Sequence, residues 1–107
     1  MTIINKYEYV YICSPYRGDV EGNVERARGY CKSAVQAGFI PVAPHIYLTQ
    51  FMDDNITTSR RIALEMGLVM LEKCVEVWVF GDKISEGMRG EIDHAQEKGI
   101  PVKYCRV

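Results

Sequence analysis

The chain has 107 residues, 48% of them apolar and 25% charged, with a formal net charge of −1 at pH 7. This length fits one domain with a real core and is too short for a second, while the nearly neutral charge gives no electrostatic footprint for nucleic acid or for a membrane surface. No apolar run approaches the length needed to cross a bilayer, and residues 1–9 lack the layout of a signal peptide, so a cytoplasmic location is expected.

Residues 9–14, YVYICS, are continuously apolar, which predicts a strand in the interior of a parallel sheet. The turn-rich segment SPYRGD follows, and a helix is expected from Asn23 to Ala37. Asn23 is a good N-cap residue, and Gly38 is a good C-terminal stop. The expected apolar face of this helix consists of Val24, Ala27, Cys31, Ala34 and Val35.

The middle of the chain predicts an edge strand, a long loop and a second helix. Residues 39–43 favour a strand, and Pro41 places it at an edge of the sheet because proline cannot donate a ladder hydrogen bond. Residues 44–55, PHIYLTQFMDDN, form a long and apolar connection, and long loops in compact domains are often functional. A helix is expected over residues 58–73. Its expected apolar face carries Ile62, Met66, Val69 and Met70.

Residues 75–99 hold the most informative strand and helix. Residues 75–80 predict a buried strand that ends at Gly81 and Asp82, and a helix follows from Ser85, a good N-cap residue, to about residue 98. A last strand is expected over residues 101–105. The apolar stripe of the helix consists of Met88, Ile92 and Ala95, at i, i+4 and i+7.

This β-α-β-α-β-α-β order predicts a flavodoxin-like, Rossmann-like α/β sandwich with a four-stranded parallel sheet and helices on both faces. Right-handed crossovers favour the strand order 2-1-3-4. Ligands bind such sheets beyond the carboxyl ends of the strands, where the winding reverses. The loops after strands one and three are therefore expected to bring Arg17, Ser85 and Glu91 to one crevice.

Glu91 is the leading candidate for chemistry in this crevice. Helical side chains lean toward the N-terminus, so its carboxylate is expected over the turn that contains Gly87 and Met88. Gly87 and Gly90 each cost roughly 1 kcal/mol in a helix relative to alanine, and they leave an open floor for a ligand. The positive end of the helix dipole favours an ionised carboxylate, which suits a nucleophile. The alternative is a surface glutamate on a glycine-containing helix.

Other candidates carry weaker signals. No GxGxxG or Walker phosphate loop is present. Arg17 and Gly18 could hold a small anion or be solvated loop residues, and Ser85 could donate to a phosphate or simply cap its helix. No Ser-His-Asp triad is suggested: His45 is more typical of a loop residue than of a catalytic base, and His94 is expected to be exposed.

The four cysteines show no Cys-x-x-Cys or histidine spacing of a zinc site, so no metal is predicted. A disulfide framework would need an oxidising compartment that no other feature indicates. Buried free thiols are therefore expected at Cys13, Cys31, Cys74 and Cys105.

Three segments resemble the nucleoside 2-deoxyribosyltransferase superfamily, which includes the 2'-deoxynucleoside 5'-phosphate N-glycosidases. They are YICSPYRG, GFIPVAPH and CVEVWVFGDKISEGMRGEIDHA, and the resemblance spans roughly residues 9–105. It implies that Glu91 attacks the anomeric carbon of a deoxyribose and that Tyr11 orients this carboxylate. It implies no metal or organic cofactor. The substrate-binding residues that it implies are Ser14, Tyr16, Arg17, Gly18, His45, Asp82, Ser85, Gly87 and Met88.

The matching residues bear on the substrate. An Arg-Gly pair in the first loop and a serine six residues before the nucleophile resemble the phosphate-preferring branch, and Arg17, Gly18 and Ser85 match both. Asp82 is a displaced candidate for the aspartate with which the transferases hold the base. Both branches carry an acidic residue in the helix before strand three, eight residues before the aspartate that opens this strand (roughly two helical turns). The strand-opening position here is Val75, and the matching helix position is Gly67. Glu65 is near but would point elsewhere on the helix. The resemblance therefore implies an N-glycosidase or a deoxyribosyltransferase, with a non-catalytic nucleotide-binding or sensor module as the alternative.

The segment IYLTQFMDD is also expected to form a contact between copies of the chain. Its apolar side chains have no obvious place in a small core, and such surfaces often mark two-fold interfaces. The resemblance likewise implies a homo-oligomer that completes its site across subunits. The alternative is a lid that folds over the crevice. The residues concerned are Ile46, Tyr47, Leu48, Phe51 and Met52.

Overall fold

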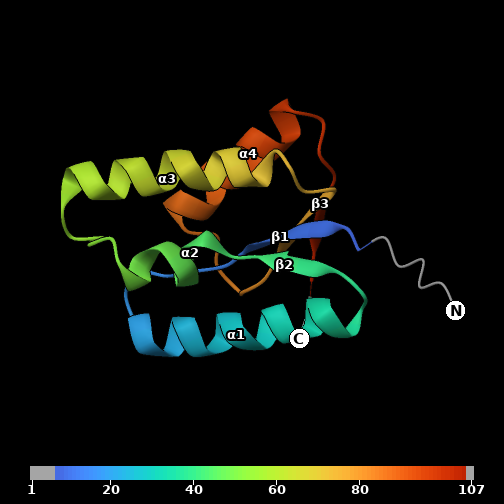
Figure 1. Cartoon of the computed structure of the whole chain (residues 1–107), viewed down its shortest axis with the longest axis horizontal. Helices are drawn as coiled ribbons and strands as arrows, with labels where there is room; N and C mark the ends of the chain where they lie inside the picture. The colour runs from blue at the N-terminus through green and yellow to red at the C-terminus, as the bar shows by residue number, and fades with distance from the viewer. Residues whose placement is uncertain (1–6, 106–107) are drawn as a thin grey trace, which may run out of the picture.

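The computed structural model describes residues 7–105, so most of the segment on which the signal-peptide prediction rests lies outside the described residues. Four parallel strands form one sheet in the predicted order β2-β1-β3-β4 (Figure 1). The strands are β1 (Tyr9–Cys13), β2 (Ile40–Val42), β3 (Glu76–Val79) and β4 (Val102–Tyr104). As predicted, the strand that contains Pro41 is an edge strand.

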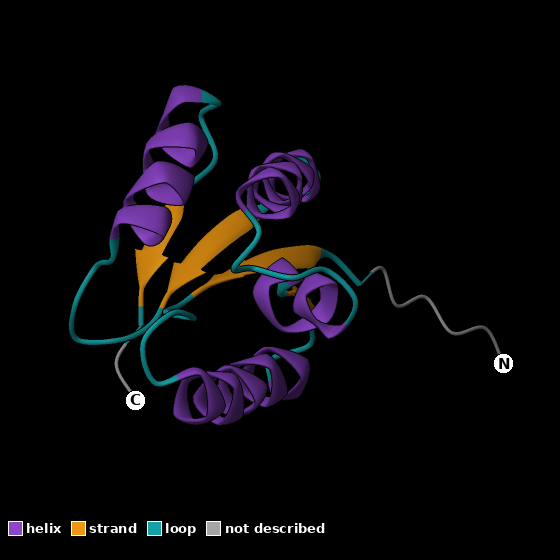
Figure 2. Cartoon of the chain, turned by 90° about the vertical axis from the view of Figure 1, so that its left-hand side faces the viewer, coloured by secondary structure: helices purple, strands orange, loops and turns teal. Residues whose placement is uncertain are grey.

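Helices cover both faces of the sheet (Figure 2). On one face, α1 (Val20–Gln36) packs on Val10, Ile12, Trp78 and Phe80 through Ala34. On the other face lie α3 (Thr57–Leu71) and α4 (Glu86–Glu97). The apolar stripe predicted for α4 is confirmed, since its buried residues are Met88, Ile92 and Ala95.

The first helix begins earlier than the sequence predicts. Asp19, not Asn23, caps α1: its carboxylate accepts a hydrogen bond from the Gly22 amide. Asn23 is instead buried inside the first turns, where its Nδ2 donates to the backbone oxygens of Tyr16 and Arg17. Its side chain therefore stabilises the loop that carries Arg17 rather than the helix terminus.

The segment predicted as a loop is partly helical. α2 (Pro44–Tyr47) begins with a proline at its first turn, where the missing amide proton costs nothing, and a 3₁₀ helix, η1 (Leu48–Gln50), follows it. Of the five apolar residues predicted to form an interface, Leu48 is buried, Ile46 and Met52 are half-buried, and Tyr47 and Phe51 are exposed.

The face predicted for α3 is wrong. The helix packs through Gly67 and Leu71, which are buried. Of the predicted face, Ile62, Met66 and Val69 are 37%, 48% and 57% exposed, and Met70 is half-buried. A glycine at the contact lets the helix backbone approach the sheet closely. This close packing outweighs the burial of the larger apolar side chains on the adjacent face of the helix.

The cysteines are all free, as predicted. Cys13 and Cys74 are buried as predicted, whereas Cys31 and Cys105 are only half-buried. None of the helices in residues 7–105 combines the length and the apolar character that crossing a membrane requires.

Candidate active site

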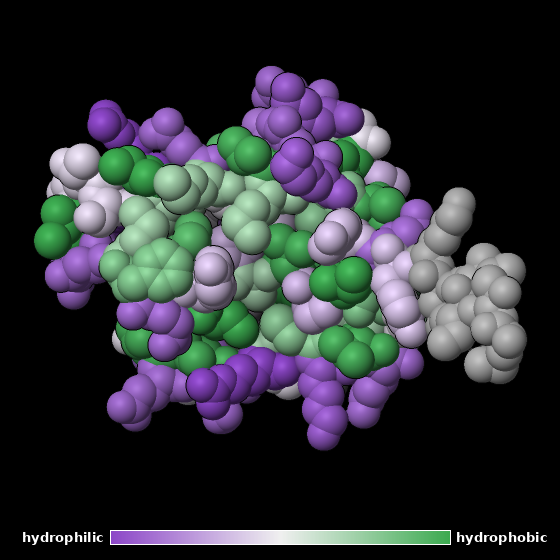
Figure 3. Space-filling view, viewed as in Figure 1, coloured by the Kyte–Doolittle hydropathy of each residue, from purple (hydrophilic) through white to green (hydrophobic). Residues whose placement is uncertain are grey.

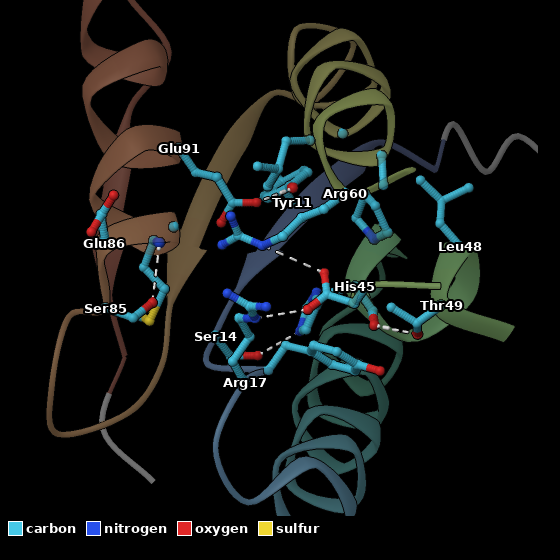
Figure 4. Close-up of a pocket in the computed structure, with 18 residues that line it drawn as sticks. Tyr11, Ser14, Arg17, His45, Leu48, Thr49, Arg60, Ser85, Glu86 and Glu91 are labelled. Atoms are coloured by element: carbon cyan, nitrogen blue, oxygen red, sulfur yellow. Dashed lines mark hydrogen bonds and ion pairs between the residues drawn. The ribbon is translucent and has the colours of Figure 1, made fainter. Parts of the chain in front are cut away.

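A pocket of about 410 Å³ opens at the carboxyl ends of β1 and β3, within the size range of small-molecule sites. Figure 4 shows α4 on one side of this pocket and α3 with α2 on the other, with side chains from both sides pointing into the space between them. The position agrees with the rule that ligands bind where the winding of a doubly wound sheet reverses.

The structure brings nine of the eleven predicted site residues to this pocket. Gly18 lines an adjacent hollow with Phe51 and Asp53 instead. Asp82 faces a third cavity beside Asn23 and Tyr30, so it is not placed to hold a base near Glu91. The residues that line the main pocket are Tyr11, Ser14, Tyr16, Arg17, His45, Ser85, Gly87, Met88 and Glu91.

Glu91 and Tyr11 form the hydrogen-bonded pair at the base of the pocket. The Tyr11 hydroxyl donates to Glu91 Oε2 (Figure 4). Tyr11 is buried, and this burial together with the neighbouring Glu91 carboxylate holds its pKa well above the usual range. The phenol therefore stays protonated and serves as a fixed donor that orients Glu91.

Burial raises the pKa of Glu91 to about 7, although the hydrogen bonds from Tyr11 and from the Cys13 thiol lower it. The sequence-based expectation from the helix dipole was a readily ionised carboxylate. Desolvation opposes this effect and prevails, because the carboxylate lies in the interior rather than at the exposed first turn. Glu91 is thus poised to change charge near neutral pH.

His45 and Ser14 form a second contact in the pocket. Ser14 Oγ and His45 Nε2 are 2.8 Å apart, and the His45 backbone oxygen accepts from the Thr49 hydroxyl at 2.7 Å. Burial lowers the pKa of His45 to about 4, so its ring is neutral at pH 7. The ring can therefore bind a ligand through hydrogen bonds but not through charge. His45 lies on α2 rather than in a loop, which corrects the sequence interpretation.

His94, predicted to be exposed, is half-buried. Its Nε2 lies 2.7 Å from Glu72 Oε2, across α4 and the end of α3. It belongs to a structural contact outside the pocket.

Ser85 caps α4, since its hydroxyl accepts from the Met88 amide at 3.2 Å. Ser85, Glu86 and Gly87 line the pocket, so the N-terminus of α4 lies at its edge, where a helix N-terminus favours an anion. Ser85 lines the pocket and caps its helix, so the N-cap alternative is confirmed, while donation to a phosphate stays a prediction.

Two arginines share one carboxylate in the pocket. Arg17 Nε lies 2.9 Å from Asp54 Oδ2, and Arg60 Nε lies 3.7 Å from Asp54 Oδ1 (Figure 4). Arg17 is therefore not a free loop charge. Asp54 is 22% exposed and Arg60 34%, whereas Arg17 is 56% exposed, so the Arg60 side of this bridge is more sheltered than an ordinary surface ion pair.

Asp54 and Arg60 were not predicted from the sequence, because ion pairs between a loop and a helix leave no periodic pattern. The apolar wall of the pocket opposite α4 was not predicted either. The only available signal was the apolar character of residues 44–55. That wall is lined by Pro44, Leu48, Ala63, Leu64 and Gly67.

Gly67 lies directly beside the catalytic candidates. A Cβ atom built at this position would be 3.3 Å from the Tyr11 hydroxyl and 3.8 Å from Pro44. Glu65, the nearest acidic residue on α3, instead forms an exposed ion pair with Arg61 at 3.9 Å. Position 67, where the resemblance leads one to expect an acid, therefore faces the pocket without an acidic side chain.

Within residues 7–105, no three His, Cys, Asp or Glu side chains are grouped so as to hold a metal ion. The chemistry that the described residues can support comes from a buried carboxylate, a tyrosine donor, two guanidinium groups and a neutral imidazole.

The family described as "Domain of unknown function (DUF7768)" matches residues 8–105. A search of curated proteins found no match. The solved structure of a 2-deoxyribosyltransferase from the psychrotolerant bacterium Bacillus psychrosaccharolyticus is similar, with a TM-score of 0.66 and 16% identity over 90% of this chain and 70% of that one. This similarity establishes the fold.

Proposed function

The chain belongs to the family described as "Domain of unknown function (DUF7768)", and for this member we propose a protein that binds a nucleoside or nucleotide and cleaves or transfers the N-glycosidic bond of a 2'-deoxynucleoside or its 5'-monophosphate. The buried Tyr11–Glu91 pair at the base of the pocket is the observation that supports this proposal most strongly. The fold shared with a 2-deoxyribosyltransferase agrees with it.

In the proposed mechanism, a Glu91 carboxylate oxygen attacks the anomeric carbon while Tyr11 holds the other oxygen. The carbon–nitrogen bond breaks, its electron pair leaves with the base, and the sugar remains on Glu91 as an ester. Water or the nitrogen of a second base then attacks the same carbon and releases the Glu91 carboxylate. This is the retaining pattern of glycosidases, and it requires no metal or organic cofactor.

The direct test incubates the protein with a panel of deoxynucleosides and their 5'-monophosphates, with and without a second base, and separates the products by chromatography. Free base is expected from hydrolysis, and a new nucleoside from transfer. The second candidate is a non-catalytic nucleotide-binding or sensor module, which the absence of an acidic side chain at Gly67 favours. Tight binding of a nucleotide with no product over the whole panel would favour this module and contradict the enzyme.

Activity is expected to rise with pH through about 7. Only the ionised Glu91 can attack, and burial raises its pKa to about 7, so kcat/KM should increase about tenfold for each pH unit below 7 and level off above it. A pH series with a cleaved deoxynucleoside measures this limb. A profile that is flat between about pH 5 and about pH 8 would contradict the assignment of Glu91.

A preference for 5'-monophosphates over free nucleosides is expected. The first-turn amides of α4 and the Arg17 guanidinium both reach the pocket, and each forms charge-assisted hydrogen bonds with phosphate. Calorimetry of each nucleoside with its 5'-monophosphate tests this, and the same pair measured with Arg17→Ala should lose most of the difference. Equal affinity for the two ligands in the parent protein would remove the phosphate assignment.

A homo-oligomer remains part of the proposal, through a surface that we call the α2–α3 patch. It consists of Tyr47, Phe51, Ile62, Met66 and Val69. Figure 3 shows apolar side chains gathered over α2 and α3 on the viewed face. The Tyr47 and Phe51 rings meet edge to face, 5.2 Å between centroids, and are 60% and 64% exposed. Apolar area of this kind commonly marks an interface.

A charge at Phe51 or Val69 is expected to weaken this oligomer without changing the fold. Sedimentation at micromolar concentration measures the effect, and a single parent species at the chain mass of 12.2 kDa would contradict the proposal. Leu48, included in the predicted interface, is only 7% exposed and lines the pocket. A charge at Leu48 should therefore affect ligand binding. Val35→Glu, at an exposed position of α1, is the matched control for added charge and should leave the oligomer unchanged.

A further inference from the structure

The pocket wall opposite α4 determines which side chains could protonate a leaving group or stabilise its charge. A nucleophile displaces a group from the opposite side of the carbon that it attacks. Glu91 reaches the pocket from α4, so the leaving group faces the wall formed by α2 and α3 (Figure 4). Apolar side chains form most of this wall, and Figure 4 shows the Arg60 side chain reaching from α3 into the space between the two walls.

Among the described residues, this wall carries no side chain suited to give a proton to a leaving group near pH 7. His45 is neutral, since burial lowers its pKa to about 4. Asp54 is ion-paired with two guanidinium groups, and the hydroxyl of Thr49 is committed to the His45 backbone oxygen. Gly67 offers no side chain, and Glu65 lies outside the pocket with Arg61.

Arg60 is the charged group that the wall does provide. It precedes Gly67 by two helical turns and therefore lies on the same face of α3. Its ion pair with Asp54 holds the guanidinium at the pocket rather than in bulk water, and its side chain is only 34% exposed. A fixed cation in a sheltered site stabilises negative charge that develops in a transition state.

We propose that Arg60, positioned by Asp54, stabilises the departing base as an anion, so that the preferred substrates are N-glycosides of bases with an acidic ring N–H, such as uracil and its 5-substituted derivatives. This inference rests on the proposed function. It names the substrate class of the same pocket, in which a leaving base needs no proton from the protein.

The step balances without a general acid. As the Glu91 oxygen bonds to the anomeric carbon, the glycosidic electron pair moves onto the base nitrogen, and the anion pairs with the Arg60 guanidinium. Water then attacks the anomeric carbon, the ester bond to Glu91 breaks, and the proton lost by that water is taken up by the base anion. Cytosine is a poor leaving group in this arrangement, because its ring N–H is much less acidic than that of uracil and its anion is correspondingly less stable.

A series of leaving groups tests the proposal by turnover. The rate of single-turnover cleavage should rise from 2'-deoxyuridine to its more acidic 5-fluoro derivative, and 2'-deoxycytidine should be slowest. Arg60→Gln should slow cleavage of 2'-deoxyuridine by about 100-fold or more, and that of the 5-fluoro compound by less. Arg61→Gln, a change at the next residue in an exposed ion pair, should leave both rates unchanged. Rates independent of leaving-group acidity, or fastest with deoxyadenosine, would overturn the inference.

A binding measurement tests the cation without any turnover. At about pH 7.5, 5-nitrouracil is largely an anion, whereas uracil is neutral. Calorimetry should show the parent protein binding 5-nitrouracil about tenfold more tightly or better, with the preference lost in Arg60→Gln and kept in Arg61→Gln. Equal binding of the two by the parent would overturn the subsite. The preference without cleavage of any N-glycoside would instead reject the proposed function and the leaving-group step, and would leave only an anion-binding pocket.

Discussion

Replacing Glu91 with glutamine is expected to abolish turnover while leaving the fold intact. The amide is nearly isosteric with the carboxyl group and can still accept from the Tyr11 hydroxyl, but it is not nucleophilic. Losing such a group costs several kcal/mol of transition-state stabilisation, which corresponds to a fall in kcat of about a thousandfold or more. Single-turnover assays at about pH 8, with the enzyme in excess over substrate, would measure this fall in rate.

The same substitution is expected to stabilise the protein above pH 7. Burial raises the pKa of Glu91 from its ordinary value of 4.5 to about 7 in the folded state. Between these values the unfolded chain binds fewer protons at Glu91 than the folded chain does, so parent stability falls as pH rises. The loss is on the order of 3 kcal/mol at full ionisation, and a glutamine does not incur it.

Denaturant unfolding of parent and Glu91→Gln at about pH 4 and about pH 8 measures this difference. The gain from glutamine should be largest at the higher pH and should vanish where Glu91 is protonated in both states. Glu97→Gln, at the exposed end of the same helix, is the matched control and should alter neither activity nor its pH dependence. Retained turnover in Glu91→Gln would exclude this residue as the nucleophile.

Replacing Gly67 with leucine is expected to remove ligand binding, with affinity reduced about 100-fold or more. A Cβ atom at this position already approaches the Tyr11 hydroxyl at 3.3 Å, and the further atoms of leucine would enter the pocket between Tyr11 and Pro44. Tyr11 would have to move, and with it the hydrogen bond to Glu91. Overfilling a packed site of this kind typically costs about 1–3 kcal/mol on its own.

Calorimetry with a nucleotide that the parent binds would measure the loss of affinity. The matched control is Gly29→Leu on α1, where an added Cβ meets nothing within 4 Å. That variant should bind normally and gain up to about 1 kcal/mol of stability, because leucine favours a helix more than glycine does. Normal binding by Gly67→Leu would show that the ligand lies elsewhere and would contradict the pocket assignment.

The sequence was sufficient for the strands, their order and the general location of the candidate pocket. Continuous apolar runs distinguish the interior strands, and Pro41 marks an edge strand because it lacks a donor for the ladder. The doubly wound topology then places the loops that carry Arg17 and Ser85 at one end of the sheet. Glu91 stood out because of the glycines around it, which are local in the chain.

The sequence was less informative where the decision depended on packing between distant segments. α3 buries Gly67 rather than Met66 and Val69, because a small residue permits close approach to Tyr11. No helical period could reveal this preference. The beginning of α1 was mispredicted for a related reason, since Asn23 serves the loop backbone through its side chain and not the helix terminus.

The charge state of the pocket also depended on tertiary structure. Spacing placed Glu91 near the start of a helix, and the dipole there favours ionisation, but burial against Tyr11 raises its pKa to about 7. The bridge from Arg17 through Asp54 to Arg60 joins the loop after β1 to the start of α3, which lies much later in the chain. Local sequence determined which residue types were present, and only the three-dimensional packing decided their solvation and their partners, because desolvation and ion pairing depend on neighbours that the linear order does not specify.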